Sequence, residues 1–187
     1  ANSQVNQYFE NDLILAGVFI LTAWPLGFYV KLENEHIRKL ENLANEDGLT
    51  GLYNHRFFYD ALGRIMKTSE KDNSLVSMML IDIDYFKIYN DVHGHQMGDE
   101  VLKTIGLILK NNFRKDDVVA RYGGEEFAII LTNTSEEDAM KLAETLRIKI
   151  EKTYFRGEEN QPNGKLTISI GISIYPDKAK NAIRSEE

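Results

Sequence analysis

A pair of adjacent glycines, Gly123 and Gly124, lies between two runs of strand-forming residues and constrains the fold more than any other feature of the sequence. Residues 117–122 precede the pair and residues 127–131 follow it, and both runs are rich in large apolar side chains. Two such runs joined by Gly-Gly predict a tight β-hairpin. Because a hairpin turn of this kind requires positive φ angles, we expect both glycines to adopt the left-handed conformation.

Two carboxylates, Glu125 and Glu126, come directly after the predicted turn. Like charges on neighbouring residues repel each other, so an ordinary turn gains nothing from the pair. Two interpretations stay open on this evidence: a solvated turn, or a site for a divalent cation that neutralises both charges.

The composition limits how such a cation site could be built. The 187 residues include no cysteine and only four histidines, so disulfides and thiolate metal sites are excluded and the ligands must be mainly oxygen. Oxygen donors favour magnesium, manganese or calcium over zinc. The net charge of −7 argues against a nucleic-acid polymer as a partner, although a small nucleotide remains compatible with it.

Residues 13–30 contain no charged side chain. At about 1.5 Å per residue, a helix of this length spans roughly 27 Å, which is just enough for the hydrocarbon core of a bilayer. We therefore predict a transmembrane helix, with a buried core helix or a signal peptide as alternatives. Acidic residues precede the stretch and basic residues follow it. This charge distribution is unlike a signal peptide and predicts that residues 1–12 are an extracytoplasmic stub and residues 31–187 are cytoplasmic.

Residues 31–46 are predicted to form a linker or signalling helix. Ile37, Leu40 and Ala44 are spaced by three and four residues, as on one face of an amphipathic or coiled-coil helix. Such a helix could carry a change in dimer geometry, and a solvated linker helix is the alternative. Because the chain begins with Ala1, we expect it to be a piece of a longer protein.

A strongly apolar run over residues 75–84 predicts a buried strand that ends in two aspartates. Asp82 and Asp84 are two residues apart, so their side chains project from the same face of the strand. Charges beside a core are costly unless they are paired or bound to a metal. The strand tip is therefore either a metal site or a strand end in contact with water.

Two further polar residues, Asn90 and Asp99, have simple explanations open to them. Asn90 could close a turn, and Asp99 could cap a helix that begins at about residue 100. Apolar periodicity and capping residues predict the other elements: helices over about residues 54–67, 100–112 and 135–152, and an alternating strand over residues 166–174.

Taken together, residues 45–176 resemble the GGDEF domain, the catalytic module of bacterial diguanylate cyclases. The resemblance depends on five ordered motifs: Asp47-x-Leu-Thr-Gly-Leu-x-Asn54, Asp82-Ile-Asp-x-Phe-Lys-x-x-Asn90-Asp91, Gly94-His95-x-x-Gly98-Asp99, Gly123-Gly124-Glu125-Glu126-Phe127 and Thr167-Ile-Ser-Ile-Gly171. Glu125 stands at the third place of the signature, where the family name has Asp, and it keeps the carboxylate.

The resemblance implies an α+β fold of the nucleotidyl-cyclase or palm type, in which helices flank a mostly antiparallel sheet. It also implies the condensation of two GTP molecules into cyclic di-GMP with release of two pyrophosphates. Each domain would hold one GTP, so that catalysis requires a homodimer. The implied setting is the inner membrane of a bacterium, with the GGDEF domain in the cytoplasm.

The family pattern implies a role for each matching position. Mg²⁺ or Mn²⁺, two ions per site, would be held by the metal-ligand group: Asp82, the carbonyl of Ile83, Glu125 and Glu126. The catalytic group would be Glu125, Glu126 and Lys87, with Glu125 as a ligand and a possible base. GTP would be bound by the substrate group: Asn90 and Asp99 for guanine, Tyr85, Phe86 and Lys87 for the triphosphate, and Gly123 and Gly124 in the hairpin.

Arg114 and Asp117 match the Arg-x-x-Asp pattern of the family's inhibitory site, where the product cyclic di-GMP binds. An arginine can form paired hydrogen bonds to phosphate or guanine, and a carboxylate can accept guanine N–H groups. The alternative is a surface ion pair.

The chain departs from the family pattern at its end, because no run matching the last helix, with its phosphate-binding Lys and Arg, follows Pro176. We therefore expect residues 47–187 to be a GGDEF domain without its last helix and the chain to be truncated at both ends. Two alternatives to a diguanylate cyclase remain: a non-catalytic module that binds GTP or cyclic di-GMP, and a nucleotidyl cyclase that takes another base.

Overall fold

The computed structural model describes residues 17–19, 21, 23–33 and 45–176 of the chain. The chain divides into two compact units, Ala1–Ala44 and Asn45–Glu187. Each unit is described by itself below.

In the first unit, the described residues 17–19, 21 and 23–33 are helical. Their large apolar side chains are exposed, and Trp24 is 79% exposed. Among the described residues, no helix has the length and apolar character needed to cross a membrane. The predicted span at 13–30 lies partly outside those residues. The predicted stub at 1–12 and the Ile37, Leu40 and Ala44 face of the linker helix lie entirely outside them.

The second unit is built on a five-stranded sheet with the order β1-β3-β4-β2-β5. All neighbouring strands are antiparallel except the short parallel pair of β1 and β3. The mostly antiparallel sheet agrees with the expected architecture. The strands are β1 (Tyr53–Asn54), β2 (Val76–Ile83), β3 (Val118–Arg121), β4 (Glu126–Thr132) and β5 (Ile168–Tyr175).

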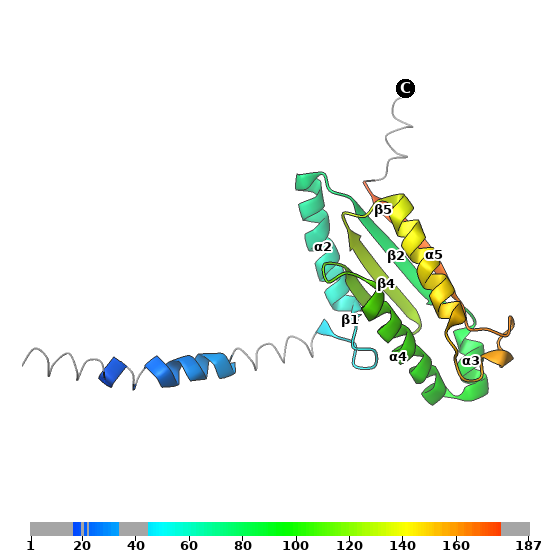
Figure 1. Ribbon diagram of the computed structural model, residues 1–187, viewed down its shortest axis with the longest axis horizontal. Helices are drawn as coiled ribbons and strands as arrows, with labels where there is room; N and C mark the ends of the chain where they lie inside the picture. Colours follow the sequence, from blue (N-terminus) through cyan, green and yellow to red (C-terminus); the bar gives the residue numbers. More distant parts are fainter. Residues whose placement is uncertain (1–16, 20, 22, 34–44, 177–187) are drawn as a thin grey trace, which may run out of the picture. The chain divides into compact units, whose positions relative to one another are not determined.

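Helices cover both faces of this sheet (Figure 1). Two of them have the caps that the sequence predicts: the side chain of Asn54 accepts a hydrogen bond from Phe57 N at the start of α2, and Ser135 accepts one from Asp138 N at the start of α5. The helices are α2 (His55–Asp72), α3 (Phe86–His93), α4 (His95–Asn112), α5 (Glu136–Lys152) and the 3₁₀ turn η1 (Glu158–Asn160).

Strand β2, which lies between β4 and β5, contributes to two hydrophobic clusters because its side chains alternate between the faces. Met79 and Ile81 are fully buried in the larger cluster, beneath α3, α4 and α5. Val76 points to the other face, where it belongs to the smaller cluster that Phe58 and Ala61 of α2 cover. Residues just beyond the end of β2 are therefore held against a rigid layer.

The structure corrects the prediction for α4. The helix begins at His95, after Gly94 with φ 81°, and not at residue 100. Asp99 therefore lies within the helix and does not cap it, so the simple explanation for this carboxylate is wrong. Asp99 is exposed on α4.

The structure also corrects the prediction for the hairpin. Strand β3 ends at Arg121 and β4 begins at Glu126, so the connection is longer than two residues. Tyr122 N and Gly123 N both donate to the carbonyl of Glu126, at 2.8 and 3.2 Å. Neither Gly123 nor Gly124 adopts the left-handed conformation, because this longer connection does not need it.

An ion pair fixes the hairpin to the beginning of the second unit. Arg121 donates through Nη2 and Nε to the carbonyl of Gly124, at 2.7 and 3.2 Å, and its Nη1 lies 3.3 Å from both oxygens of Asp47. Asp47 in turn accepts from the amide and the hydroxyl of Thr50. Burial alone would raise the pKa of Asp47, but the Thr50 hydrogen bonds and the Arg121 charge outweigh it, so the pKa is lowered.

We expect Asp47→Asn to lower the free energy of unfolding by about 1 kcal/mol at pH 7, since it removes one charge of a half-buried pair. A carboxyl whose folded pKa is lowered contributes stability above its unfolded pKa of about 3.9 and loses it as the pH falls through the folded pKa. The gap between wild type and variant should therefore close below about pH 4.

Urea denaturation at pH 7 and at pH 3 measures the gap. The exposed carboxylate Asp60 on α2 offers a control, and Asp60→Asn should change the stability by less than about 0.5 kcal/mol at both values. A gap for Asp47→Asn that is the same at both pH values would contradict the ion pair.

Candidate active site

The acidic residues of the hairpin and of β2 meet because of the strand register. In the sheet, Asp82 of β2 lies opposite Glu126 of β4 on one side and opposite Ser169 of β5 on the other. Directly opposed residues of antiparallel strands project from the same face. The carboxylates that the sequence places 44 positions apart are thus neighbours across one strand pair.

The electrostatics show that these carboxylates repel one another. Loss of surrounding water, followed by the nearby charge of Asp84, raises the pKa of Asp82. Loss of water, followed by the charges of Asp82 and Glu126, raises the pKa of Glu125. A bound cation would relieve this repulsion, so the group has the charge that a cation site needs.

The donor set fits a magnesium-like ion that is shared with a phosphate substrate. Among the residues that the structure describes, no three side chains from His, Asp and Glu converge as a ready-made cation cage. Mg²⁺ typically takes one or two carboxylates and completes its shell with water and substrate phosphates. Asp82, the carbonyl of Ile83, Glu125 and Glu126 are the oxygen donors available for such an ion at this strand end.

Gly123 leaves room for one of these carboxylates. A Cβ at this position would lie 2.5 Å from Oε2 of Glu126, so the side chain of Glu126 folds over the glycine. Gly124 has no neighbouring atom within 4 Å of the same point and is exposed. Gly123 therefore provides space for the side chain of Glu126, and Gly124 leaves space at the exposed tip of the turn.

Asp84 is held differently from Asp82. Its Oδ2 accepts a hydrogen bond from the hydroxyl of Thr167 at 2.6 Å, and its Oδ1 accepts one from the hydroxyl of Ser169 at 2.7 Å. Its backbone N–H donates to the carbonyl of Thr167 at 3.0 Å. The two aspartates predicted to act together thus have different surroundings.

A strained turn connects β2 to α3. Tyr85 has φ 56° and ψ 26°, the left-handed conformation, and precedes α3 without a side-chain cap. The next residue, Phe86, is buried in the larger hydrophobic cluster. Lys87 follows it as an exposed residue of α3. The first N–H groups of a helix have no partner within the helix, and they can bind an anion.

Asn90 carries a buried polar atom that lacks a partner. Its Oδ1 accepts no hydrogen bond, although it is shielded from water. A Cβ at Gly98 of α4 would collide with that oxygen, so the amide occupies the space that the glycine leaves. Leaving such an acceptor unpaired costs about 1–3 kcal/mol. The predicted role of Asn90 in closing a turn does not explain this atom.

The far end of α3 is anchored to the loop that carries η1. The hydroxyl of the buried Tyr89 donates to the carbonyl of Arg156 at 2.5 Å. Nε2 of His93 lies 3.1 Å from the carbonyl of Gly157. These contacts hold α3, and with it Lys87 and Asn90, in a fixed position.

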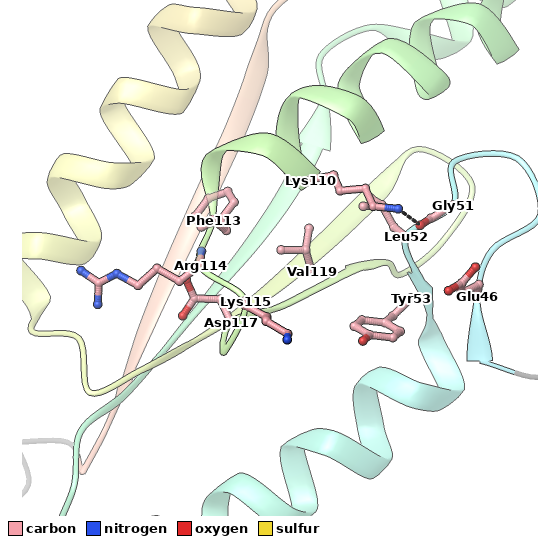
Figure 2. A pocket seen from close by; sticks show the side chains of 10 residues that line it. All are labelled: Glu46, Gly51, Leu52, Tyr53, Lys110, Phe113, Arg114, Lys115, Asp117 and Val119. Atoms are coloured by element: carbon pink, nitrogen blue, oxygen red, sulfur yellow. Dashed lines mark hydrogen bonds between the residues drawn. The ribbon is translucent and has the colours of Figure 1, made fainter. Parts of the chain in front are cut away.

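A cavity of about 280 Å³ lies apart from these residues, at the C-terminal end of α4. Its lining includes Arg114 and Asp117, and Asp117 Oδ2 accepts from Arg114 N at 2.9 Å. Figure 2 shows the Arg114 side chain extending away from Tyr53, while Lys115 lies on the side of Tyr53. Three of the lining side chains are cationic, namely Lys110, Arg114 and Lys115.

The sequence reasoning missed some of the residues that support these two sites. Thr167 and Ser169 appeared only as part of a motif, and their alternation with isoleucines was the signal that both would face the Asp82 side of the sheet. No sequence pattern indicated Lys110 or Tyr53. They line the cavity because α4 and β1 both pack against β3.

Comparison with known proteins places this arrangement in one class. Residues 44–185 match the family described as "Diguanylate cyclase, GGDEF domain". The chain belongs to this family.

Two curated relatives show how much of the sequence is shared. The response regulator PleD of Caulobacter vibrioides is 42% identical over 142 residues, which cover 76% of this chain and 31% of PleD. The probable diguanylate cyclase DgcT of Escherichia coli is 37% identical over 145 residues, which cover 78% of this chain and 32% of DgcT. The chain thus spans about a third of the length of these relatives.

A solved structure has the same fold. The coiled coil and GGDEF domain of DgcB from Caulobacter crescentus, in complex with c-di-GMP, superimposes with a TM-score of 0.71 at 29% identity and covers 83% of each chain.

Proposed function

We propose that this chain carries the catalytic domain of a diguanylate cyclase, which condenses two GTP molecules into cyclic di-GMP and releases two pyrophosphates. The observation that carries the proposal is the cluster of repelling carboxylates of Asp82, Glu125 and Glu126 at neighbouring strand ends. The family match and the c-di-GMP complex of DgcB support the choice of reaction.

The proposed substrate fits the residues around the carboxylates. The amide of Asn90 and the exposed carboxylate of Asp99 are groups that can pair with the O6 acceptor and the N–H donors of guanine. The N–H groups at the start of α3 and the charge of Lys87 suit the triphosphate. Adenine offers a different pattern of donors, so these residues favour guanine over another base.

In the proposed reaction, the 3′-OH of one GTP attacks the α-phosphate of the other, a P–O bond forms, and pyrophosphate leaves. Glu125 is the proposed acceptor of the hydroxyl proton, because its carboxylate lies close to those of Asp82 and Glu126, where the metal and the triphosphate would be held. Mg²⁺ or Mn²⁺ held by Asp82, Ile83, Glu125 and Glu126 would supply Lewis acidity and neutralise phosphate charge. One chain binds one GTP in this scheme, so two copies must face each other.

We expect Glu125→Gln to lower cyclic di-GMP formation from GTP and Mg²⁺ by about 100-fold or more, because it removes the carboxylate charge and the base. Chromatography of the reaction products measures the rate, and circular dichroism verifies the fold. Glu137→Gln on α5 makes the same change at an exposed ion pair and should leave the rate unaltered.

Near-normal turnover by Glu125→Gln would refute the assignment. Wild-type protein that binds GTP without forming product would favour the non-catalytic signalling module, and equal turnover of ATP would favour a cyclase for another base.

We also propose that Arg114 and Asp117 bind the product and inhibit the enzyme. The cavity is lined by three cationic side chains and the two carboxylates of Glu46 and Asp117, and this excess of positive charge supports an anionic ligand there. Arg114→Ala should raise the cyclic di-GMP concentration that halves the initial rate by about tenfold or more, since a paired contact to phosphate or guanine is lost.

Initial rates at increasing product concentration test this role. Arg147→Ala on α5 removes an exposed arginine that pairs with Glu144 and Glu151, and it should leave inhibition as in wild type. Unchanged inhibition of Arg114→Ala would exclude the site.

Finally, we propose that residues 13–30 anchor the chain in a bacterial inner membrane with the catalytic domain in the cytoplasm. The uncharged sequence and the exposed apolar side chains of its described residues support an apolar environment. Leu21→Lys should lower the fraction of full-length chain that sediments with phospholipid vesicles, because a charge near the centre of a span costs about 3 kcal/mol.

Leu107→Lys provides the control, since it makes the same change at an exposed leucine of α4. Equal sedimentation of the two variants would speak against the anchor.

A further inference from the structure

The carboxylate of Asp84 links the candidate active site to the region where β5 begins. The two oxygens of Asp84 accept the hydroxyls of Thr167 and Ser169, and the Asp84 N–H donates to the Thr167 carbonyl. Hydrogen bonds to an ionised carboxylate are about twice as strong as neutral ones. Three hydrogen bonds therefore join the residue after β2 to the beginning of β5 and the residue before it.

The geometry separates Asp84 from its neighbour Asp82. Both lie on the same face, two residues apart, and a metal site could have used both carboxylates. Instead, the two oxygens of Asp84 accept hydrogen bonds from the hydroxyls of Thr167, just before β5, and Ser169 of β5, whereas Asp82 lies opposite Glu126 of β4. The structure thus gives Asp84 a partner other than a cation.

The residue after Asp84 needs such a support. Tyr85 is a bulky residue in the left-handed conformation, which is unfavourable for a residue with a side chain. A strained residue persists only when its surroundings hold it from both sides. The preceding residue, Asp84, is held by three hydrogen bonds, and the ring of the following residue, Phe86, is buried.

We propose that Asp84 is a positioning residue for the triphosphate-binding turn and acts through the hydroxyls of Thr167 and Ser169. The inference rests on the proposed function of the turn. The hydroxyls fix Asp84, Asp84 fixes the conformation of Tyr85, and Tyr85 sets the direction of the first N–H groups of α3. Loss of either hydroxyl should therefore weaken GTP binding without changing the metal requirement.

The first variants remove the hydroxyls of Thr167 and Ser169 and leave every carboxylate in place. In Thr167→Val and Ser169→Ala, the KM for GTP should rise about tenfold, while the Mg²⁺ concentration for half-maximal turnover stays within twofold of wild type. Thr167→Ser restores a hydroxyl and should restore the KM. A further variant, Asp84→Ala, removes the shared acceptor and should raise the KM as much as Thr167→Val and Ser169→Ala combined. Adding Asp84→Ala to those two changes should raise the KM little more, as expected for residues that act as one unit.

Two controls separate positioning from general damage. Thr145→Val makes the same change at a hydroxyl that bonds only within α5 and should leave the KM unaltered. Melting temperatures identify any variant that fails to fold. Ser169 is exposed on an edge strand, so Ser169→Ala carries the test if Thr167→Val unfolds.

Titration with a GTP analogue that has an α,β-methylene bridge distinguishes a failure of the proposed function from a failure of the positioning role of Asp84. Wild type that binds the analogue but forms no cyclic di-GMP from GTP would overturn the proposed function, and weaker analogue binding by the hydroxyl variants would still support the inference. An active wild type whose hydroxyl variants keep the normal KM would overturn the inference alone. Wild type that neither binds nor reacts would overturn both.

Discussion

The pairing of β2 with β4 on one side and β5 on the other is the interaction on which the candidate site depends. Because β2 is the central partner, the register fixes Asp82 between Glu126 and Ser169 at once. The buried side chains of Met79 and Ile81 keep this register, since a slip by one residue would turn them to the opposite face. The acidic group is thus positioned by the hydrophobic core.

Periodicity and capping chemistry identified the elements that are stabilised locally. The sequence indicated the strand over residues 75–84, observed as β2 (Val76–Ile83), together with the Asn54 cap of α2 and the Ser135 cap of α5. Helix α3 could not, because an eight-residue helix is marginal by itself and depends on contacts such as Tyr89 with Arg156, far away in the chain.

The same distinction applies to the site residues. The carboxylates stood out because charges beside an apolar run are unusual, and the left-handed glycines of the hairpin were expected from turn statistics. The actual turn is longer. The missing side chain of Gly123 leaves room for the side chain of Glu126, a contact that the local sequence does not specify. The hydroxyl partners of Asp84 come from a strand more than eighty residues later and became visible only with the register.

The close approach of Asn90 to Gly98 has a consequence for how this domain can diverge. The amide of Asn90 lies where a side chain at position 98 would stand, so even an alanine at position 98 would displace it and press on the ring of Phe86. The close contact between α3 and α4 can therefore persist only while position 98 remains a glycine or position 90 takes a smaller side chain. The two positions are constrained to change together.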